Sequence, residues 1–366
     1  MIGRAPGRLD LLGGVADYAG ALVLETPTRA ATTVTVRPAD ALVVGPVRLT
    51  AGALRSLAAM PYRELRAALA EHPTWTHYIL GVALVLIRHG VIDPPSGAIE
   101  VASDVPQSVG VSSSAALEVA TARALGADAV DPLRLAALCQ EAENHVVGAP
   151  CGIMDQVTVA MGVRDALLPI LCRPAAVRAA LPLPPDVQVV GWPTGVQHAV
   201  SGAAYRRARV AAFMGKRIAE ASSGRAVDWV SEIPPPSLAA LPELLSGAEF
   251  LARWRRIDDC VTSIDEQETY PVRAAASFGV QEHRRCEAAL SLVAARRFAE
   301  LAPLLAASHA GYDAIGLGHP TATAIVSAAV ARPGVYGARS SGGGCGGTVV
   351  VICRRGALDD VAALIR

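Results

Sequence analysis

The chain has 366 residues, of which 52% are hydrophobic and 18% are charged, and its 33 Lys and Arg residues balance 33 Asp and Glu residues. Nucleic acids and anionic membranes are bound through a surplus of Lys and Arg, so a chain without net charge is not expected to bind either of them. The length suggests two domains with a large core, and the expected partner is a small molecule.

Residues 78–87 form the longest apolar run, about half of the length that a bilayer span requires, and we predict a buried helix there. The residues after Met1 lack the basic, apolar and small-residue pattern of a secretion signal. The seven cysteines are scattered without a Cys-x-x-Cys pair, which indicates reduced thiols and disfavours a zinc site. We therefore expect a cytoplasmic protein in which any metal is bound by oxygen atoms.

The first part of the chain mixes strand and helix patterns. Strands are predicted at residues 22–24, 32–36, 42–44 and 98–101. Helices are predicted at residues 61–72, 78–89, 114–125 and 132–147. Because the two kinds of element do not alternate regularly, their order predicts an α+β fold rather than a series of βαβ units.

A proline-dense stretch at residues 181–186 is predicted to be a stiff connector. A strand is predicted directly after it, at residues 187–191. We place the domain boundary at this connector, which divides the chain into domains of residues 1–183 and 184–366.

The second half is predicted to be mostly helical, broken by a loop at residues 234–236, and to end with a strand at residues 348–353. Five of the six residues before that strand, 342–347, are glycine. Such a cluster is tolerated chiefly where the backbone packs against a ligand or another loop, and the alternative is a flexible hairpin turn. Cys345 is expected to be a small filler, because no basic neighbour in sequence lowers the pKa of its thiol.

A serine-rich segment, residues 105–117, reads Val-Pro-Gln-Ser-Val-Gly-Val-Ser-Ser-Ser-Ala-Ala-Leu. Gly110 allows close approach of a ligand to the backbone, and the hydroxyls of Ser112, Ser113 and Ser114 can cap the following helix. The N–H groups and positive end of that helix suit a polyphosphate, and a serine hydroxyl can reach a magnesium ion. The alternative is an ordinary serine-capped helix. The chain has no Walker A loop, because no Gly-x-x-x-x-Gly-Lys sequence occurs.

Two acidic residues, Glu143 and Asp155, flank a Gly-Ala-Pro-Cys-Gly turn. Glu143 is expected near the end of an amphipathic helix, and the turn is expected to project Asp155 into a cleft. Such carboxylates can divide the work, one binding Mg²⁺ and the other orienting or deprotonating an attacking hydroxyl. The alternative is a solvated Glu and a helix-capping Asp. His145 is interpreted as a packing residue or a helix-end charge.

The opening segment, residues 4–18, contains two further candidates. Arg8 can neutralise charge on a phosphoryl group during transfer, and Asp17 can accept hydrogen bonds from a polyol. Either residue can instead form a surface ion pair, which is the usual role of such side chains.

Four motifs resemble, in their order and separation, the signatures of the GHMP small-molecule kinases: Ala5-Pro-Gly-Arg8, the serine-rich segment, Gly152-Ile-Met-Asp155 and the glycine-rich segment. The sequences of these motifs are similar to those of the galactokinase branch. They are most similar to those of the kinase part of L-arabinokinases, which share a Gly-Gly-Val-Ala-Asp-Tyr sequence like that of residues 13–18. The resemblance implies an α+β fold with a ribosomal S5 domain 2-like N-terminal domain, a ferredoxin-like C-terminal domain and an active site between them. It implies a monomer or homodimer that uses ATP and Mg²⁺.

The resemblance also implies roles for individual residues. Asp155 would act on the anomeric hydroxyl as a base or an orienting anion, while Arg8 would stabilise the phosphoryl group and hold Asp155 ionised. Ser114 and Glu143 match the magnesium positions. The implied ATP-contacting residues are Gly110, Ser112, Ser113, Ser114, Gly343 and Gly344, and the implied sugar-contacting residues are Gly14, Asp17, Gly152 and Tyr205.

One departure from the galactokinase pattern is informative. Residues 14–16 read Gly-Val-Ala where galactokinases usually read Glu-His-Thr, and that Glu engages the hydroxyl on carbon 6 of galactose. A site without this carboxylate leaves no buried acceptor unpaired when a pentose binds, which favours L-arabinose as the substrate. Because Gly14 also opens space, a 6-deoxy, acidic or larger sugar is an alternative, as is galactose itself.

Two other classes of protein remain open from the sequence. One is a sugar sensor that binds ATP and sugar without turnover, and the other is a mevalonate-type or homoserine-type kinase. The intact serine-rich segment, with Arg8, Glu143 and Asp155 present, argues against the sensor, and residues 17–18 with 150–155 favour a sugar over the smaller substrates.

Overall fold

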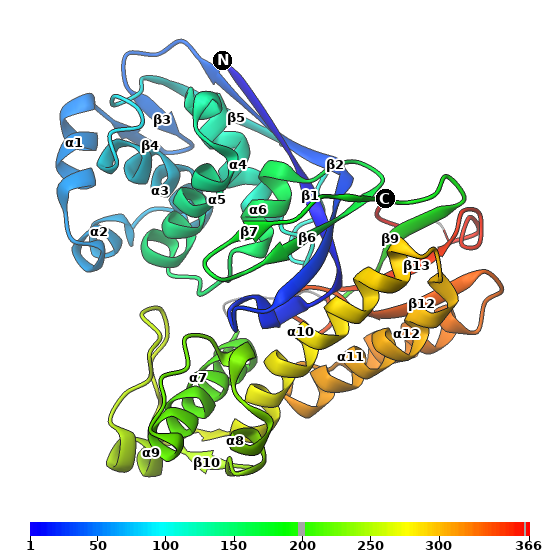
Figure 1. The fold of residues 1–366 in the computed structure, drawn as a ribbon. Helices are drawn as coiled ribbons and strands as arrows, with labels where there is room; N and C mark the ends of the chain where they lie inside the picture. Colours follow the sequence, from blue (N-terminus) through cyan, green and yellow to red (C-terminus); the bar gives the residue numbers. More distant parts are fainter. Residues whose placement is uncertain (197–201, 362–363) are drawn as a thin grey trace. The chain divides into compact units, whose positions relative to one another are not determined.

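The computed structural model describes residues 1–196, 202–361 and 364–366. The chain forms two compact units, each built from several segments (Figure 1). Unit 1 comprises Met1–Arg8, Pro27–Gln107 and Ser112–Gly162, and unit 2 comprises Leu9–Thr26, Ser108–Val111 and Val163–Arg366. Two long strands, β1 (Ile2–Leu12) and β2 (Leu22–Arg37), contribute residues to both units.

These units differ from the two contiguous domains predicted from the sequence. Residues 163–183 group with unit 2, because β6 (Ala166–Leu171) pairs antiparallel with residues 22–25 of β2. The two strands predicted at residues 22–24 and 32–36 are one continuous strand of 16 residues. The polar residues between them and Pro27 hide this continuity from a search for apolar alternation.

Unit 1 combines a sheet with a helical layer. In the sheet, β5 pairs antiparallel with residues 32–37 of β2 and parallel with β3, which in turn pairs with β4. The other elements of unit 1 are β3 (Leu42–Val44), β4 (Val47–Leu49), β5 (Gly97–Ser103), α1 (Ala51–Ala59), α2 (Tyr62–Leu69), α3 (Thr74–Arg88), α4 (Ser113–Ala124), η2 (Ala127–Ala129), α5 (Pro132–Glu141), η3 (Ala142–Val147) and α6 (Met154–Met161). All eight residues from residue 79 to residue 86 of α3 are buried, which confirms the predicted core helix.

Unit 2 contains a three-stranded antiparallel sheet in the order β12, β13, β9, with α11 and α12 packed on β12 and with α7 packed on α10 (Figure 1). Its remaining elements are η1 (Gly14–Asp17), β7 (Ala176–Val177), β8 (Leu181–Pro182), β9 (Val187–Pro193), α7 (Ala203–Ser223), η4 (Val230–Glu232), α8 (Pro235–Ala239), β10 (Leu245–Ser246), α9 (Gly247–Trp254), β11 (Thr269–Tyr270), α10 (Val272–Ala294), η5 (Phe298–Leu301), α11 (Ala302–Ala314), α12 (Pro320–Val330), β12 (Val335–Ser340) and β13 (Thr348–Arg354). The α+β class is therefore confirmed.

The loop predicted at residues 234–236 is wrong. Pro235 and Pro236 begin the short helix α8, with Pro234 at the N-cap. Proline is well accommodated in the first turn of a helix, because the N–H groups of that turn have no partner within the helix.

Within the described residues, no helix is both long enough and apolar enough to span a membrane. All seven cysteines lie in the described part of the chain and are thiols.

Leu80 lies at the centre of the unit 1 core and is 0% exposed. Leu80→Ala is expected to lower the free energy of unfolding by about 2–5 kcal/mol, because it removes buried methyl groups and leaves a cavity. The same substitution at Leu244, which is 62% exposed, is the control and should change stability by less than about 0.5 kcal/mol. Urea unfolding followed by tryptophan fluorescence measures both, and equal losses would contradict this description of the core.

Candidate active site

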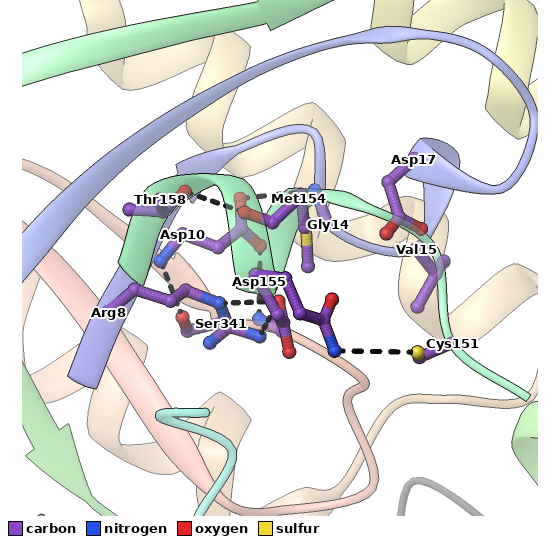
Figure 2. A network of polar contacts seen from close by, with 12 residues as sticks. Arg8, Asp10, Gly14, Val15, Asp17, Cys151, Met154, Asp155, Thr158 and Ser341 are labelled. Atoms are coloured by element: carbon purple, nitrogen blue, oxygen red, sulfur yellow. Dashed lines mark hydrogen bonds and ion pairs between the residues drawn. The ribbon is translucent and has the colours of Figure 1, made fainter. Parts of the chain in front are cut away.

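Arg8 and Asp155 form an ion pair within unit 1 (Figure 2). Both Nε and Nη2 of Arg8 contact the same Asp155 oxygen, Oδ1, at 2.8 and 2.7 Å. The side chain of Arg8 is 3% exposed and that of Asp155 is 16% exposed, so this is not the surface ion pair that was the alternative for Arg8. Asp155 lies in the first turn of α6, where the positive end of the helix favours a carboxylate. The arrangement fixes one carboxylate and leaves part of it accessible.

Glu143 is buried rather than solvated. It lies in η3, a π-helical turn that follows α5, and π-helical turns occur frequently at functional sites. The Ser114 hydroxyl and the Gln156 amide donate hydrogen bonds to the Glu143 carboxylate, the latter at 2.6 Å. Burial, and after it the charge of Asp155, raises the pKa of Glu143 to about 7. The structure therefore brings Glu143, Ser114 and Asp155 together, as the sequence predicted.

A third acidic residue, Glu118, was missed by the sequence analysis. It lies in α4 and is 0% exposed. The Gln156 Nε2 group bridges the two acids, since it donates to Glu118 Oε2 at 3.0 Å and to Glu143 Oε2 at 2.6 Å. Burial, and after it the charge of Glu143, raises the pKa of Glu118 well above its ordinary value. The signal available in the sequence was an acid directly between two apolar neighbours within a predicted helix.

The serine-rich segment has an unusual backbone. Ser108, Gly110 and Ser112 have φ values of 58°, 75° and 58°, so every second residue lies in the left-handed region. Such alternation can turn successive N–H groups toward one side and create an anion site. Ser113 begins α4 directly after it.

The predicted capping of α4 by Ser112 is wrong. Ser112 is the N-cap residue, but its left-handed backbone does not direct the hydroxyl onto the first-turn N–H groups. Its Oγ is buried and makes no hydrogen bond to any described residue. This orphaned hydroxyl lies next to a helix N-terminus, which is consistent with a ligand contact at this position.

The residues fit a magnesium ion. Ser114 and Glu143 offer a hydroxyl and a carboxylate in direct contact, and oxygen ligands of this kind suit Mg²⁺. Among the described residues, no group of three or more His, Cys, Asp or Glu side chains is placed to hold a metal. Mg²⁺ is commonly held by one or two carboxylates together with substrate phosphates, so a dedicated cage is not required.

The turn before Asp155 is fixed by side chains of η3. The amide of Asn144 accepts a hydrogen bond from the Cys151 N–H at 2.8 Å and donates one to the Cys151 carbonyl at 3.3 Å. Gly152 follows and is buried. His145 stacks on Tyr62 with ring centroids 5.0 Å apart, which confirms its packing role.

In unit 2, Asp17 and Tyr205 both lie beside Tyr18. Asp17 is 4% exposed and accepts a hydrogen bond from the Tyr18 N–H at 2.6 Å, so it is not a surface ion-pairing residue. Tyr205 packs edge-to-face on the Tyr18 ring at 5.9 Å. The Arg209 guanidinium lies 5.3 Å from the centre of that ring and pairs with Asp259 at 2.8 Å. Arg209 and Asp259 were not identified from the sequence, because each is isolated from the motifs along the chain.

Gly14 does not open space, contrary to the sequence expectation. Its φ is +52°, and a Cβ atom there would lie 1.9 Å from the Tyr312 hydroxyl and 2.9 Å from Nη2 of Arg339. Both side chains are completely buried. The volume beside Gly14 is therefore filled by protein.

The glycine-rich segment is buried rather than a flexible hairpin. A Cβ on Gly344 would lie 2.5 Å from the Leu317 carbonyl oxygen, and Gly343 is buried beside it. The Cys345 N–H donates to that same carbonyl at 2.7 Å. The segment thus packs closely on the chain after α11, and burial raises the pKa of the Cys345 thiol, as a filler role requires.

Comparison with known proteins identifies the family. The family models for the GHMP kinases N terminal domain and the GHMP kinases C terminal domain match residues 77–163 and 289–364. A galactokinase from Chloroflexus aggregans is 31% identical over 100% of this chain and 87% of its own length. The chain belongs to the GHMP kinase family. An L-arabinokinase from Arabidopsis thaliana is 33% identical over 96% of this kinase, which spans 42% of the length of the plant protein.

The fold agrees with this assignment. The structure of Lactococcus lactis galactokinase complexed with galactose superposes with a TM-score of 0.74 at 21% identity, over 99% of this chain and 87% of the other. The predicted two-domain GHMP architecture is thus confirmed, and the sequence relatives confirm the kinship with galactokinases and L-arabinokinases. This protein is an enzyme of the sugar kinase group.

Asp155→Asn is expected to lower kcat by at least about a hundredfold, because the amide neither accepts a proton nor carries the charge that Arg8 holds in place. The KM for sugar should stay within a fewfold of the wild-type value. A coupled assay of ADP release measures both constants, and Asp93→Asn, at an exposed position of the same unit, is the control. Near-normal turnover of the Asp155 variant would mean that another group performs its role.

Proposed function

We propose that this enzyme transfers the γ-phosphoryl group of ATP to the anomeric hydroxyl of a galacto-configured monosaccharide, with L-arabinose as the preferred substrate. The observation that carries the proposal is the partly accessible carboxylate of Asp155, paired with Arg8 and close to Ser114 and Glu143. The similarity to the plant L-arabinokinase and to galactokinases supports the class of substrate.

In the proposed reaction, the anomeric oxygen attacks the γ-phosphorus, a new O–P bond forms, and the bond to the ADP oxygen breaks. Asp155 orients the hydroxyl and accepts its proton as the O–P bond forms. Arg8 offsets negative charge on the phosphoryl group during transfer. Phosphoryl transfer depends mainly on positioning and charge neutralisation, so a lysine of the Walker type is not needed.

The serine-rich segment is the proposed triphosphate site. The left-handed residues from Ser108 to Ser112 and the N-terminus of α4 supply N–H groups, while the buried Ser112 hydroxyl supplies a further contact. Ser114 and Glu143 would hold Mg²⁺, which would offset negative charge on the triphosphate. Gly343 and Gly344 are proposed to shape the site through their buried backbone.

The preference for a pentose follows from residue 14. Gly14 carries no carboxylate for a hydroxyl on carbon 6, so L-arabinopyranose leaves no acceptor unpaired there. Asp17 and Tyr205 are proposed as contacts to the other sugar hydroxyls, with Gly152 at the turn that carries Asp155. The seven thiols fit a cytoplasmic location.

The substrate proposal is tested by measuring kcat/KM for L-arabinose and D-galactose with ATP and Mg²⁺. L-Arabinose should be favoured by at least about tenfold, because one unmatched polar group typically discriminates by that factor or more. A preference for galactose would reject the pentose assignment and leave a galactokinase. Sugar binding without ADP release would reject catalysis altogether.

Glu143→Ala is expected to raise the Mg²⁺ concentration needed for half-maximal activity by at least about tenfold, because one of two proposed ligands is lost. Glu71→Ala, at an exposed position of the same unit, is the matched control. Titration of activity with Mg²⁺ at saturating ATP makes the comparison. An unchanged requirement would remove Glu143 from the magnesium site.

A further inference from the structure

The turn between β1 and η1 is held by buried side chains from three different parts of unit 2. Three consecutive backbone N–H groups donate to them: Gly13 to Glu282 Oε1 at 3.1 Å, Gly14 to Asp10 Oδ1 at 3.0 Å, and Val15 to the Tyr312 hydroxyl at 3.2 Å. Because each N–H group has its own buried partner, the backbone of this turn cannot shift without breaking one of these bonds.

Tyr312, in α11, is the closest of these side chains to Gly14. Its hydroxyl accepts the hydrogen bond from Val15 and donates one to the carbonyl of Gly342, so the position of the oxygen is fixed from two sides. The ring is 0% exposed and packs edge-to-face on Phe278 at 5.5 Å. Burial raises the pKa of Tyr312, which keeps the hydroxyl neutral and able to donate.

Arg339, in β12, closes the other side of the same volume. Its Nη1 donates to Asp10 Oδ2 at 2.8 Å, and the guanidinium lies 4.9 Å from the centre of the Tyr312 ring. Asp10 Oδ2 also accepts from the Gly342 N–H at 3.0 Å. The Asp10 N–H donates to Ser341 Oγ at 3.1 Å (Figure 2). Asp10 therefore ties the turn to the glycine-rich segment and to Arg339.

A side chain at position 14 has no room in this arrangement. Its Cβ would meet the Tyr312 hydroxyl at 1.9 Å, far inside van der Waals contact, while the ring carbon behind that oxygen, Cζ, would lie at 3.0 Å. Most of the obstruction is thus a single oxygen atom. Arg339 Nη2, at 2.9 Å, is the next obstacle, and it makes no hydrogen bond to any described residue.

We infer that Tyr312 is a specificity-determining residue: by filling the volume beside Gly14, it prevents residue 14 from carrying the carboxylate that would recognise the exocyclic hydroxyl of a hexose. The inference rests on the proposed sugar site at residues 14–17. Protein atoms fill the volume behind Gly14, so there is no empty pocket that a larger sugar could enter. Gly14 and Tyr312 then act as one determinant. Replacing either residue alone does not change the substrate preference to hexoses.

The packing part of the inference is tested by a double-mutant cycle of Gly14→Ala and Tyr312→Phe, read as shifts in Tm. Gly14→Ala should lower the Tm strongly in the wild-type background and much less in the Tyr312→Phe background, where the obstructing oxygen is absent. The hydrogen bonds that Tyr312→Phe removes are absent from both members of that background, and the backbone strain that Gly14→Ala adds is the same in both backgrounds. Both effects therefore cancel in the comparison. Equal shifts in the two backgrounds would overturn the inference.

Gly224→Ala is the matched control for backbone strain. Gly224 has φ +65°, close to the +52° of Gly14, but a Cβ there meets no described atom within 4 Å. Its effect on the Tm should reflect backbone strain alone and should be independent of Tyr312→Phe. A coupling between Gly224 and Tyr312 as large as that of Gly14 would overturn the steric explanation.

The specificity part is tested with Gly14→Glu in the wild-type and Tyr312→Ala backgrounds. The double variant should raise the ratio of kcat/KM for D-galactose to that for L-arabinose by at least about tenfold over Gly14→Glu alone. An unchanged ratio, together with a positive coupling in Tm, would show that Tyr312 fills the volume without setting specificity and would overturn the inference. A wild-type preference for galactose would instead refute the proposed preference for L-arabinose, so the two failures are distinguishable.

Discussion

Burial of several carboxylates close together is the constraint on which unit 1 depends. Burial raises the pKa of Glu143 and of Glu118, and the charge of Asp155 adds to this rise in both residues. Each acid has a donor that offsets this repulsion, namely Arg8 for Asp155 and the bridging amide of Gln156 for the other two. A buried charge without such a donor costs several kcal/mol, so the positions of these side chains are mutually determined. The ordered carboxylate that results is what a phosphoryl-transfer enzyme needs, because its catalysis depends on positioning.

In unit 2, backbone segments approach one another more closely than side chains would permit. Gly14 and Gly344 both face Tyr312 at distances that no Cβ atom can adopt. Asp10 joins the same segments through its two oxygens, one on the Gly14 N–H and the other on Gly342 and Arg339. The glycines are thus explained by contact within the protein, and a glycine in a ligand-binding motif need not mark an open space.

The residues proposed for phosphoryl transfer and those proposed to select the sugar lie in different units. The residues proposed for phosphoryl transfer, Arg8, Asp155, Ser114 and Glu143, all lie in unit 1. The packing around Gly14, proposed to select the sugar, is built within unit 2. Substitutions that change the sugar therefore need not disturb the carboxylates proposed to perform the chemistry, which fits a family that includes galactokinases and an L-arabinokinase.

The sequence by itself determined the family, the α+β class, and some of the helices and strands, because these follow from local patterns and from motifs with specific sequences; the family resemblance also implied that Arg8 acts on Asp155. It did not reveal Glu118, Arg209 or Asp10 as partners, since their contacts come from residues up to 332 positions away. It also gave the wrong picture of Ser112 and Gly14. Backbone conformation decided the first, and the packing of Tyr312 and Arg339 decided the second. Whether a position next to a glycine is empty or filled depends on side chains from distant elements, and only the tertiary structure brings those together.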